Sequence, residues 1–362
     1  RRMSEVEAIE RPPGEHAAQA GAGPLPAGHP DVPQRRIGIL LINLGTPDGT
    51  DYRSMRRYLA EFLSDKRVID YPAWLWQPLL QLVILTKRPF SSARSYRSIW
   101  NTERDESPLR TVTRSQADKL AARFADRHPA VTVDWAMRYG NPSIRSVLDR
   151  MAGAGCDRIA LMALYPQYAA PTTATAYDKA FEALTTMRRQ PAIRTMAPYH
   201  DDPRYIELLA SSVERHLAGL DWAPQRLIMS YHGLPKRFLT SGDPYHCMCH
   251  KTTRLVRQRL GWAEERVMTC FQSRFGTEEW LQPYFDRTLE RLPKEGVTRI
   301  AVISPAFVAD CIETLEEIDQ EGRHDFLAAG GEAFTYIPCL NDDDAHVAFL
   351  QQLAEEEIQG WV

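Results

Sequence analysis

The 362-residue chain has no excess of positive charge: 44 Lys and Arg residues stand against 47 Asp and Glu, and the formal net charge is −3. Nucleic-acid binding is not indicated, because that class usually needs a basic surface to neutralise phosphates. The sequence also contains neither a Gly-x-Gly-x-x-Gly motif nor a Walker motif. The common forms of nucleotide binding therefore find no support.

Long apolar runs are also missing. The most apolar segment, residues 74–89, is broken by two glutamines and a proline, whereas a membrane-spanning helix takes about 20 mostly apolar residues. Its tryptophans, together with Lys87 and Arg88 near its end, instead suit a helix at a membrane surface, with the apolar face in lipid and the charges among the headgroups. An ordinary core helix is the alternative interpretation.

Cysteines are few and scattered, and no secretory signal is recognised, so we expect a reducing, cytoplasmic setting without a disulfide framework. Residues 1–35 are rich in Pro, Ala and Gly and lack apolar periodicity, which predicts disorder. Acidic residues in this stretch argue against an organelle transit peptide. The six cysteines are Cys156, Cys247, Cys249, Cys270, Cys311 and Cys339.

Short β-branched runs alternate with helical stretches from Ile37 onward, a pattern typical of parallel βαβ units. The length favours two domains. We therefore predict an α/β fold of two similar Rossmann-like lobes at residues 36–197 and 198–362, each with a four-stranded parallel sheet flanked by helices, and a C-terminal helix in the second lobe. The eight strands are predicted at residues 37–43, 131–137, 158–164, 192–196, 226–231, 267–271, 299–304 and 333–338.

The first lobe holds about fifty more residues than the second between its first two strands, and we place this insertion at about residues 50–109. An insertion at the carboxyl end of a strand lies over the ligand crevice of a parallel sheet. The apolar segment 74–89 is part of this insertion. It is therefore a candidate lip of a binding site for a hydrophobic ligand.

His232 is the first candidate for chemistry. It follows a predicted buried strand and precedes Gly233 and Pro235, which turn the chain sharply. A histidine at such a strand end can act as a base near neutral pH or as a metal ligand. A buried structural histidine is the alternative.

Glu313 is the second candidate, because it follows the equivalent of a crevice-facing strand in the second lobe. Glu313, Glu317 and Glu321 are spaced by four residues and share one face of a predicted helix, which could guide a divalent cation. A solvated acidic stripe is the commoner cause of this spacing. The apolar residues between these glutamates favour the functional interpretation.

Aromatic and arginine side chains also follow predicted strands, and these are Arg138, Tyr139, Tyr165 and Trp280. Each could be local packing. Together they would surround the crevice with apolar faces suited to a large flat ligand.

These motifs resemble those of ferrochelatases, which insert ferrous iron into protoporphyrin IX in the last step of haem synthesis. The resemblance runs from about Ile37 to the C-terminal helix. It is carried by residues 41–47, 107–109, 137–139, 165–168, 231–235, 242–245, 271–273 and 312–317, with Trp280.

The resemblance implies that His232 and Glu313 are the catalytic and metal-binding pair, with Glu317 extending the metal site. Protoporphyrin IX and Fe²⁺ are the implied substrates, and an iron donor and an upstream porphyrin enzyme are expected partners. We expect a cytoplasmic protein that contacts the inner face of the membrane through residues 74–89. The candidate porphyrin-binding residues are Leu44, Tyr96, Arg138, Tyr139, Tyr165 and Trp280.

Cys247 and Cys249 are soft ligands close together in sequence, and we consider them candidate ligands of a 2Fe–2S cluster. Reduced surface thiols are the alternative. Other functions compatible with the same fold are iron insertion into coproporphyrin, cobalt insertion into a corrinoid precursor, and non-catalytic binding of a tetrapyrrole or siderophore.

Overall fold

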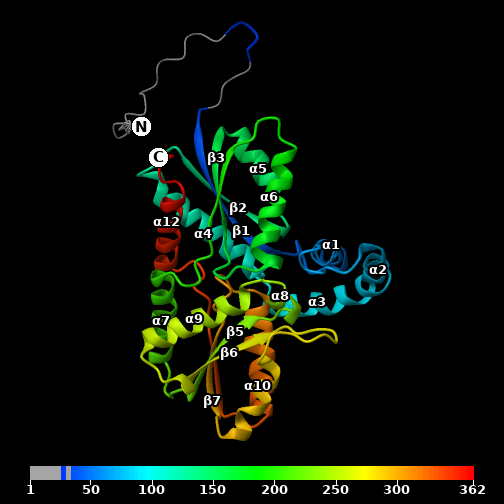
Figure 1. Ribbon diagram of the computed structural model, residues 1–362, viewed down its shortest axis with the longest axis vertical. Helices are drawn as coiled ribbons and strands as arrows, with labels where there is room; N and C mark the ends of the chain where they lie inside the picture. Colours follow the sequence, from blue (N-terminus) through cyan, green and yellow to red (C-terminus); the bar gives the residue numbers. More distant parts are fainter. Residues whose placement is uncertain (1–25, 30–33) are drawn as a thin grey trace, which may run out of the picture. The chain divides into compact units, whose positions relative to one another are not determined.

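The structure is a computed structural model that describes residues 26–29 and 34–362. Residues 35–362 form one compact unit, which contains two lobes, each built on its own sheet (Figure 1). The prediction of disorder for residues 1–35 lies almost wholly outside the described residues.

The first lobe contains the predicted four-stranded parallel sheet. Its strand order is β2-β1-β3-β4. Residues Ile39 to Ile42 of the central strand are fully buried, because helices cover both faces and a parallel strand of this kind carries apolar side chains on each. The strands are β1 (Arg36–Thr46), β2 (Val131–Gly140), β3 (Cys156–Ala163) and β4 (Ala192–Thr195).

The second lobe repeats this arrangement, with a parallel sheet in the order β6-β5-β7-β8. The predicted strands are confirmed to within a few residues at each end. They are β5 (Arg226–His232), β6 (Val267–Gln272), β7 (Arg299–Ile303) and β8 (Ala333–Ile337).

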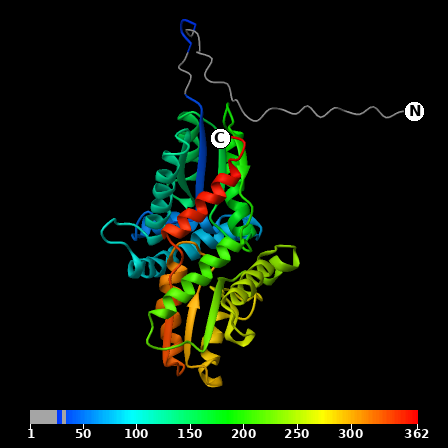
Figure 2. The same ribbon diagram turned by 90° about the vertical axis from the view of Figure 1, so that its left-hand side faces the viewer.

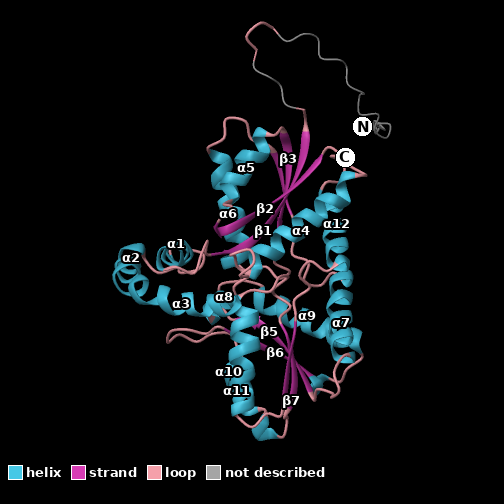
Figure 3. Cartoon of the chain, turned by 180° about the vertical axis from the view of Figure 1, so that it is seen from behind, coloured by secondary structure: helices cyan, strands magenta, loops and turns pink. Residues whose placement is uncertain are grey.

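Helices cover both faces of each sheet (Figure 3). In the first lobe α5 and α6 pack on one face and α4 on the other, and in the second lobe α9 packs opposite α10 and α11. The helices outside the insertion are α4 (Pro108–Ala125), α5 (Ile144–Gly153), η2 (Ala170–Ala174), α6 (Thr175–Thr185), α7 (Pro203–Ala218), α8 (Lys236–Thr240), α9 (Tyr245–Leu260), η3 (Glu264–Arg266), α10 (Phe285–Arg291), η4 (Pro293–Glu295), η5 (Glu313–Gly322), α11 (Arg323–Ala328) and α12 (Asp344–Glu357).

Two helices join the lobes. Helix α7 packs on α9 and β8 of the second lobe, whereas α12, which the sequence assigns to the second lobe, packs on α4 and β3 of the first. Figure 2 shows α12 in red along the first lobe. A single cluster of buried apolar side chains runs through both sheets and these two helices.

The insertion in the first lobe forms α1 (Tyr52–Leu63), α2 (Ala73–Leu79), the π-helix η1 (Leu80–Ile84) and α3 (Leu85–Ile99). These helices project on one side of the compact unit (Figure 1). Only a minority of the apolar side chains in residues 74–89 are buried, among them Leu80 and Leu85, while Trp74 and Leu82 are 76% and 75% exposed. An ordinary core helix would bury most of them, so this segment lies on the surface of the protein rather than in its core.

None of the helices in the described part of the chain is long and apolar enough to cross a membrane.

The strand order explains where a ligand can bind. In each lobe the chain leaves the central strand toward opposite edges of the sheet, so a crevice opens at the carboxyl ends of two neighbouring strands. In the second lobe these strands are β5, which ends at His232, and β7, which is followed by the loop that leads to Glu313. In the first lobe they are β1, which contains Leu44 near its end, and β3, which is followed by Tyr165.

Candidate functional site

His232 is the last residue of β5 and is half-buried. Its Nδ1 lies 2.7 Å from the carbonyl oxygen of Gly233, and since a carbonyl can only accept, Nδ1 carries the proton and donates it. In the neutral imidazole the other nitrogen, Nε2, then has a free lone pair. The backbone thus selects the tautomer that can accept a proton or bind a metal through Nε2.

The turn after His232 requires glycine because two segments approach it closely. A Cβ at Gly233 would lie 2.6 Å from the carbonyl oxygen of Gln272 and 3.2 Å from Cε3 of Trp280. Trp280 is buried, pairs with Pro235 through an isolated β-bridge, and has no hydrogen-bond partner for its indole nitrogen among the described residues. The predicted tryptophan therefore lies next to the predicted histidine.

Glu313 is positioned by the segment between β7 and η5. The buried carboxylate of Asp310 accepts hydrogen bonds from Thr314 (3.0 Å), Tyr336 (2.7 Å) and Asn341 (2.7 Å). The backbone N–H of Cys311 donates in turn to the Thr314 hydroxyl. This network holds the start of η5, and with it Glu313, at the end of the sheet.

Glu317 interacts electrostatically with both His232 and Glu313. Its Oε2 accepts hydrogen bonds from the Ser273 hydroxyl at 2.5 Å and from Nε2 of Gln272 at 3.2 Å. Burial raises the pKa of Glu317, and the negative charge of Glu313 adds to this, while the Ser273 hydrogen bond and the nearby His232 oppose it. The three titratable groups therefore lie within electrostatic reach of one another.

Gln272 and Ser273 orient Glu313 and Glu317. The sequence motifs alone predict no role for these two residues. Gln272 accepts a hydrogen bond from Ser230 (2.6 Å) through Oε1, which directs its Nε2 to the carbonyl of Glu313 at 2.9 Å. Ser273 has a φ of 65°, a left-handed conformation that is unusual for a non-glycine residue. This backbone strain turns its hydroxyl toward Glu317, and no sequence pattern signals it.

The helix that carries the glutamates is a ten-residue π-helix, η5. π-helices are rare and are frequent at functional sites. Glu317 and Glu321 both line a pocket of about 140 Å³, together with Ser273 and Asp325. Two of the three glutamates predicted to share a face thus line one pocket, whereas Glu313 lines a different one. The sequence spacing did not predict the helix type.

Tyr96 comes close to Glu313 from the first lobe. Tyr96 and Glu313 line the same small pocket, of about 10 Å³, with Tyr58 and Cys311. Burial raises the pKa of Tyr96, and the charge of Glu313 raises it further. Leu44 packs against the apolar clusters that contain Tyr96 and Tyr165.

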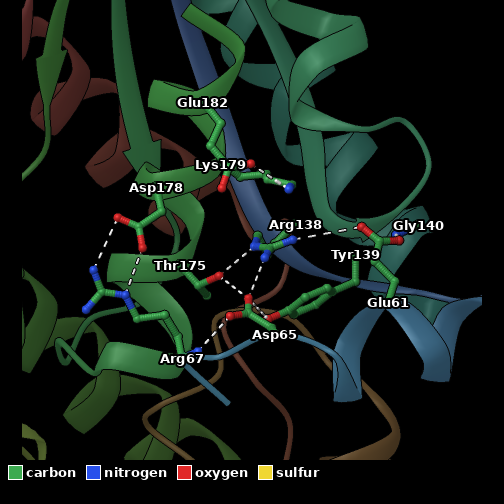
Figure 4. Close-up of polar contacts among 10 residues, drawn as sticks. All are labelled: Glu61, Asp65, Arg67, Arg138, Tyr139, Gly140, Thr175, Asp178, Lys179 and Glu182. Carbon is green, nitrogen blue, oxygen red and sulfur yellow. Dashed lines mark hydrogen bonds and ion pairs between the residues drawn. The ribbon is translucent and has the colours of Figure 1, made fainter. Parts of the chain in front are cut away.

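Arg138 and Tyr139 belong to a buried polar network around Asp65 (Figure 4). The Asp65 carboxylate accepts hydrogen bonds from Arg138, from Thr175 and from the Tyr139 hydroxyl at 2.8 Å. Tyr139 is fully buried and Arg138 nearly so. Both side chains are thus held inside this network. Asp65, which holds them, could not be predicted from the sequence because it lies in a loop without a motif.

The two cysteines of the Cys-x-Cys pair lie apart. Both are in α9, where residues two apart face different sides of the helix; Cys247 is exposed and Cys249 is fully buried. Burial raises the pKa of the Cys249 thiol well above its usual range. Within the described residues, no group of three or more His, Cys, Asp or Glu side chains could hold a metal ion. The cysteine pair therefore lacks further cluster ligands in this part of the chain, and the predicted set of His232, Glu313 and Glu317 does not form a three-ligand site for a resident metal.

A family model for ferrochelatase matches residues 36–358. The ferrochelatase of Rhodobacter capsulatus is 62% identical over 339 residues, which cover 93% of this chain and 97% of that relative. The ferrochelatase of Agrobacterium fabrum is 58% identical over 338 residues, with 93% and 98% covered. SirB from Bacillus subtilis with Fe³⁺ shares the fold, with a TM-score of 0.52 at 13% identity over 90% of this chain and 98% of that one. The chain belongs to the ferrochelatase family.

Proposed function

We propose that this chain inserts Fe²⁺ into protoporphyrin IX with His232 and Glu313 as the groups that meet the reacting atoms. The ferrochelatase activity, a step of haem biosynthesis, follows from the family, and relatives that are 56–62% identical do not favour the alternatives of another chelatase or a non-catalytic binder. The residue assignment rests on one observation. Gln272, which pairs with His232 between β5 and β6, donates from Nε2 to both the Glu313 carbonyl and the Glu317 carboxylate, and so brings the three residues to one place.

The reaction requires that two pyrrole N–H protons leave while one Fe²⁺ enters, so the site needs proton acceptors beside the ring. His232 offers the lone pair of Nε2, and Glu313 offers a carboxylate. Glu317, with its raised pKa, can take a proton from this pair and pass it toward the pocket that it lines with Glu321. Fe²⁺ is a substrate here, and the same acidic side chains suit its delivery.

His232→Ala and Glu313→Gln should each lower the rate of iron insertion by at least about 100-fold, the usual effect of losing a general acid–base group. Both variants should still bind porphyrin, as measured by fluorescence quenching. Glu316→Gln is the matched control, because it changes a carboxylate of the same helix to which the assignment gives no role. Near-normal turnover in His232→Ala would overturn the assignment.

We also propose that residues 74–89 contact the membrane surface and receive porphyrin there. Trp74, Leu75, Leu79, Leu82 and Val83 are exposed in this segment. Soluble monomers rarely expose an apolar patch of this kind without a partner. The segment lies beside the pocket of Glu313, since α3, which carries Tyr96, packs on η5.

A 2Fe–2S cluster is not included in the proposed function. Cys249 is buried and Cys247 is exposed on the same helix, and the described residues bring no further ligands to them.

A further inference from the structure

The insertion carries an unusual distribution of charge. Residues 71–102 contain four basic side chains and no Asp or Glu, although the chain as a whole has a net charge of −3. The rest of the chain therefore has a net charge of −7. The basic residues are Lys87, Arg88, Arg94 and Arg97, all on α3 and all exposed.

The exposed apolar side chains of the same segment continue to Phe90, which is 64% exposed. Helices α2, η1 and α3 thus present apolar and basic side chains in one short stretch, the combination found in helices that lie in a membrane interface. We call the exposed side chains Trp74, Leu75, Leu79, Leu82, Val83, Lys87, Arg88, Phe90 and Arg94 the docking face.

The second lobe adds to this face. The loop after β6 projects on the same side as α3 (Figures 1 and 3), and its Phe275 is 47% exposed. The guanidinium of Arg88 lies 5.9 Å from the centre of the Phe275 ring. Phe275 in turn packs edge-on against Trp280 at 5.0 Å, so a single side chain separates the docking face from the tryptophan beside His232.

We propose that the docking face, together with Phe275, binds bilayers that contain anionic lipids in preference to zwitterionic ones. This inference rests on the proposed membrane contact and adds the class of lipid and the participation of the second lobe. Anionic headgroups attract the three basic side chains of the docking face and repel the remaining, acidic part of the chain, so electrostatics also orients the molecule with its crevice toward the bilayer.

The test is sedimentation of the full chain with vesicles of phosphatidylcholine alone or mixed with phosphatidylglycerol. The wild type should partition more strongly into the anionic vesicles, and this preference should fall at high salt. Lys87→Gln/Arg94→Gln should weaken binding to anionic vesicles about 25-fold, at about fivefold per charge, with little effect on neutral ones. Arg188→Gln/Arg189→Gln is the control, because it removes the same charge from an exposed turn outside the docking face.

Phe275→Ser should weaken binding to both kinds of vesicle. Unchanged vesicle binding in this variant would show that the second lobe does not contribute to the docking face. Equal binding of the wild type to both vesicles would overturn the lipid preference but leave the proposed membrane contact standing. Absence of binding to either vesicle would overturn both. Iron insertion measured in detergent with a soluble porphyrin tests the roles of His232 and Glu313 independently.

Discussion

Glu317 is the residue whose environment differs most from that of an ordinary surface glutamate. Its side chain is half-buried at the edge of a pocket, and Glu313 lies nearby. Partial burial, reinforced by the negative charge of Glu313, disfavours the charged form and raises the pKa above 4.5. The folded chain then keeps this proton to a higher pH than the unfolded chain does. Between the unfolded and the folded pKa, stability must therefore fall as pH rises.

Glu317→Gln should remove this fall, because an amide keeps the hydrogen bond from Ser273 and never ionises. The free energy of unfolding of the variant relative to wild type should rise between pH 5 and pH 8, by about 1.4 kcal/mol for each tenfold increase in proton affinity on folding. Urea denaturation at both pH values measures it. A difference between variant and wild type that does not change with pH would contradict the raised pKa.

The cysteine pair leads to a prediction at the same scale. Because Cys247 is exposed and Cys249 is buried, anaerobically purified protein should show no charge-transfer absorption of a cluster in the visible range. Cys247→Ser should change stability by less than about 0.5 kcal/mol, whereas Cys249→Ala should cost about 1–2 kcal/mol through lost packing. A brown preparation that loses its colour in Cys247→Ser would restore the cluster.

Single residues were predictable where a motif marked the end of a strand. The sequence predicted His232, Glu313 and Trp280 in this way, because a strand's carboxyl end has a defined place in a parallel sheet. The structure does place Trp280 beside the turn that follows His232, and the roles of the three residues stay predictions. Asp65 and Ser273 were not, since their roles arise from contacts between segments far apart in sequence. Such contacts leave no periodic signal.

At the scale of elements, the strands followed from apolar runs with turn residues at their ends, and η5 shows the limit of that reasoning. A spacing of four residues between glutamates predicts a helix with one acidic face, and Glu317 and Glu321 do line one pocket while Glu313 lines another. The same spacing does not distinguish i→i+4 from i→i+5 hydrogen bonding, because the choice depends on what holds the ends of the helix. Here Asp310 holds one end through Thr314.

The network of Figure 4 joins three elements, since Asp65 follows α1, Arg138 lies in β2 and Thr175 begins α6. Asp65→Asn would leave the buried guanidinium of Arg138 without its partner. We expect a loss of about 3–5 kcal/mol in the free energy of unfolding, measured by urea denaturation.

Glu61→Gln is the control for this variant, because Glu61 also pairs with Arg138, but at 3.8 Å and from a partly exposed position. This change should lower the free energy of unfolding by less than about 1 kcal/mol. Burial raises the pKa of Asp65, but its hydrogen bonds from Thr175, Arg67 and Tyr139 and the charge of Arg138 outweigh burial and leave the pKa lowered. The stabilisation is therefore present above about pH 4 and is lost as pH falls through the folded pKa. A gap between Asp65→Asn and wild type that persists at pH 2 would contradict this linkage.

The two lobes are more closely joined than the repeated sequence pattern suggests. The sequence predicts two lobes because strands and turns recur, and the two sheets are there. The sequence pattern did not reveal that α12 returns to the first lobe, because its apolar face carries no mark of the surface it covers. The result is one apolar cluster that runs through both lobes.

This shared core predicts that the two lobes unfold together. Scanning calorimetry should give one transition with a ratio of calorimetric to van't Hoff enthalpy near 1, as for a single domain. Leu350→Ala, at a fully buried site of α12, should cost about 2–5 kcal/mol and lower the temperature of that entire transition. Gln352→Ala, on the exposed face of the same helix, should change it by less than about 0.5 kcal/mol. If Leu350→Ala instead split the transition in two, with the second lobe melting at the wild-type temperature, the lobes would be independent folding units and α12 would stabilise the first lobe alone.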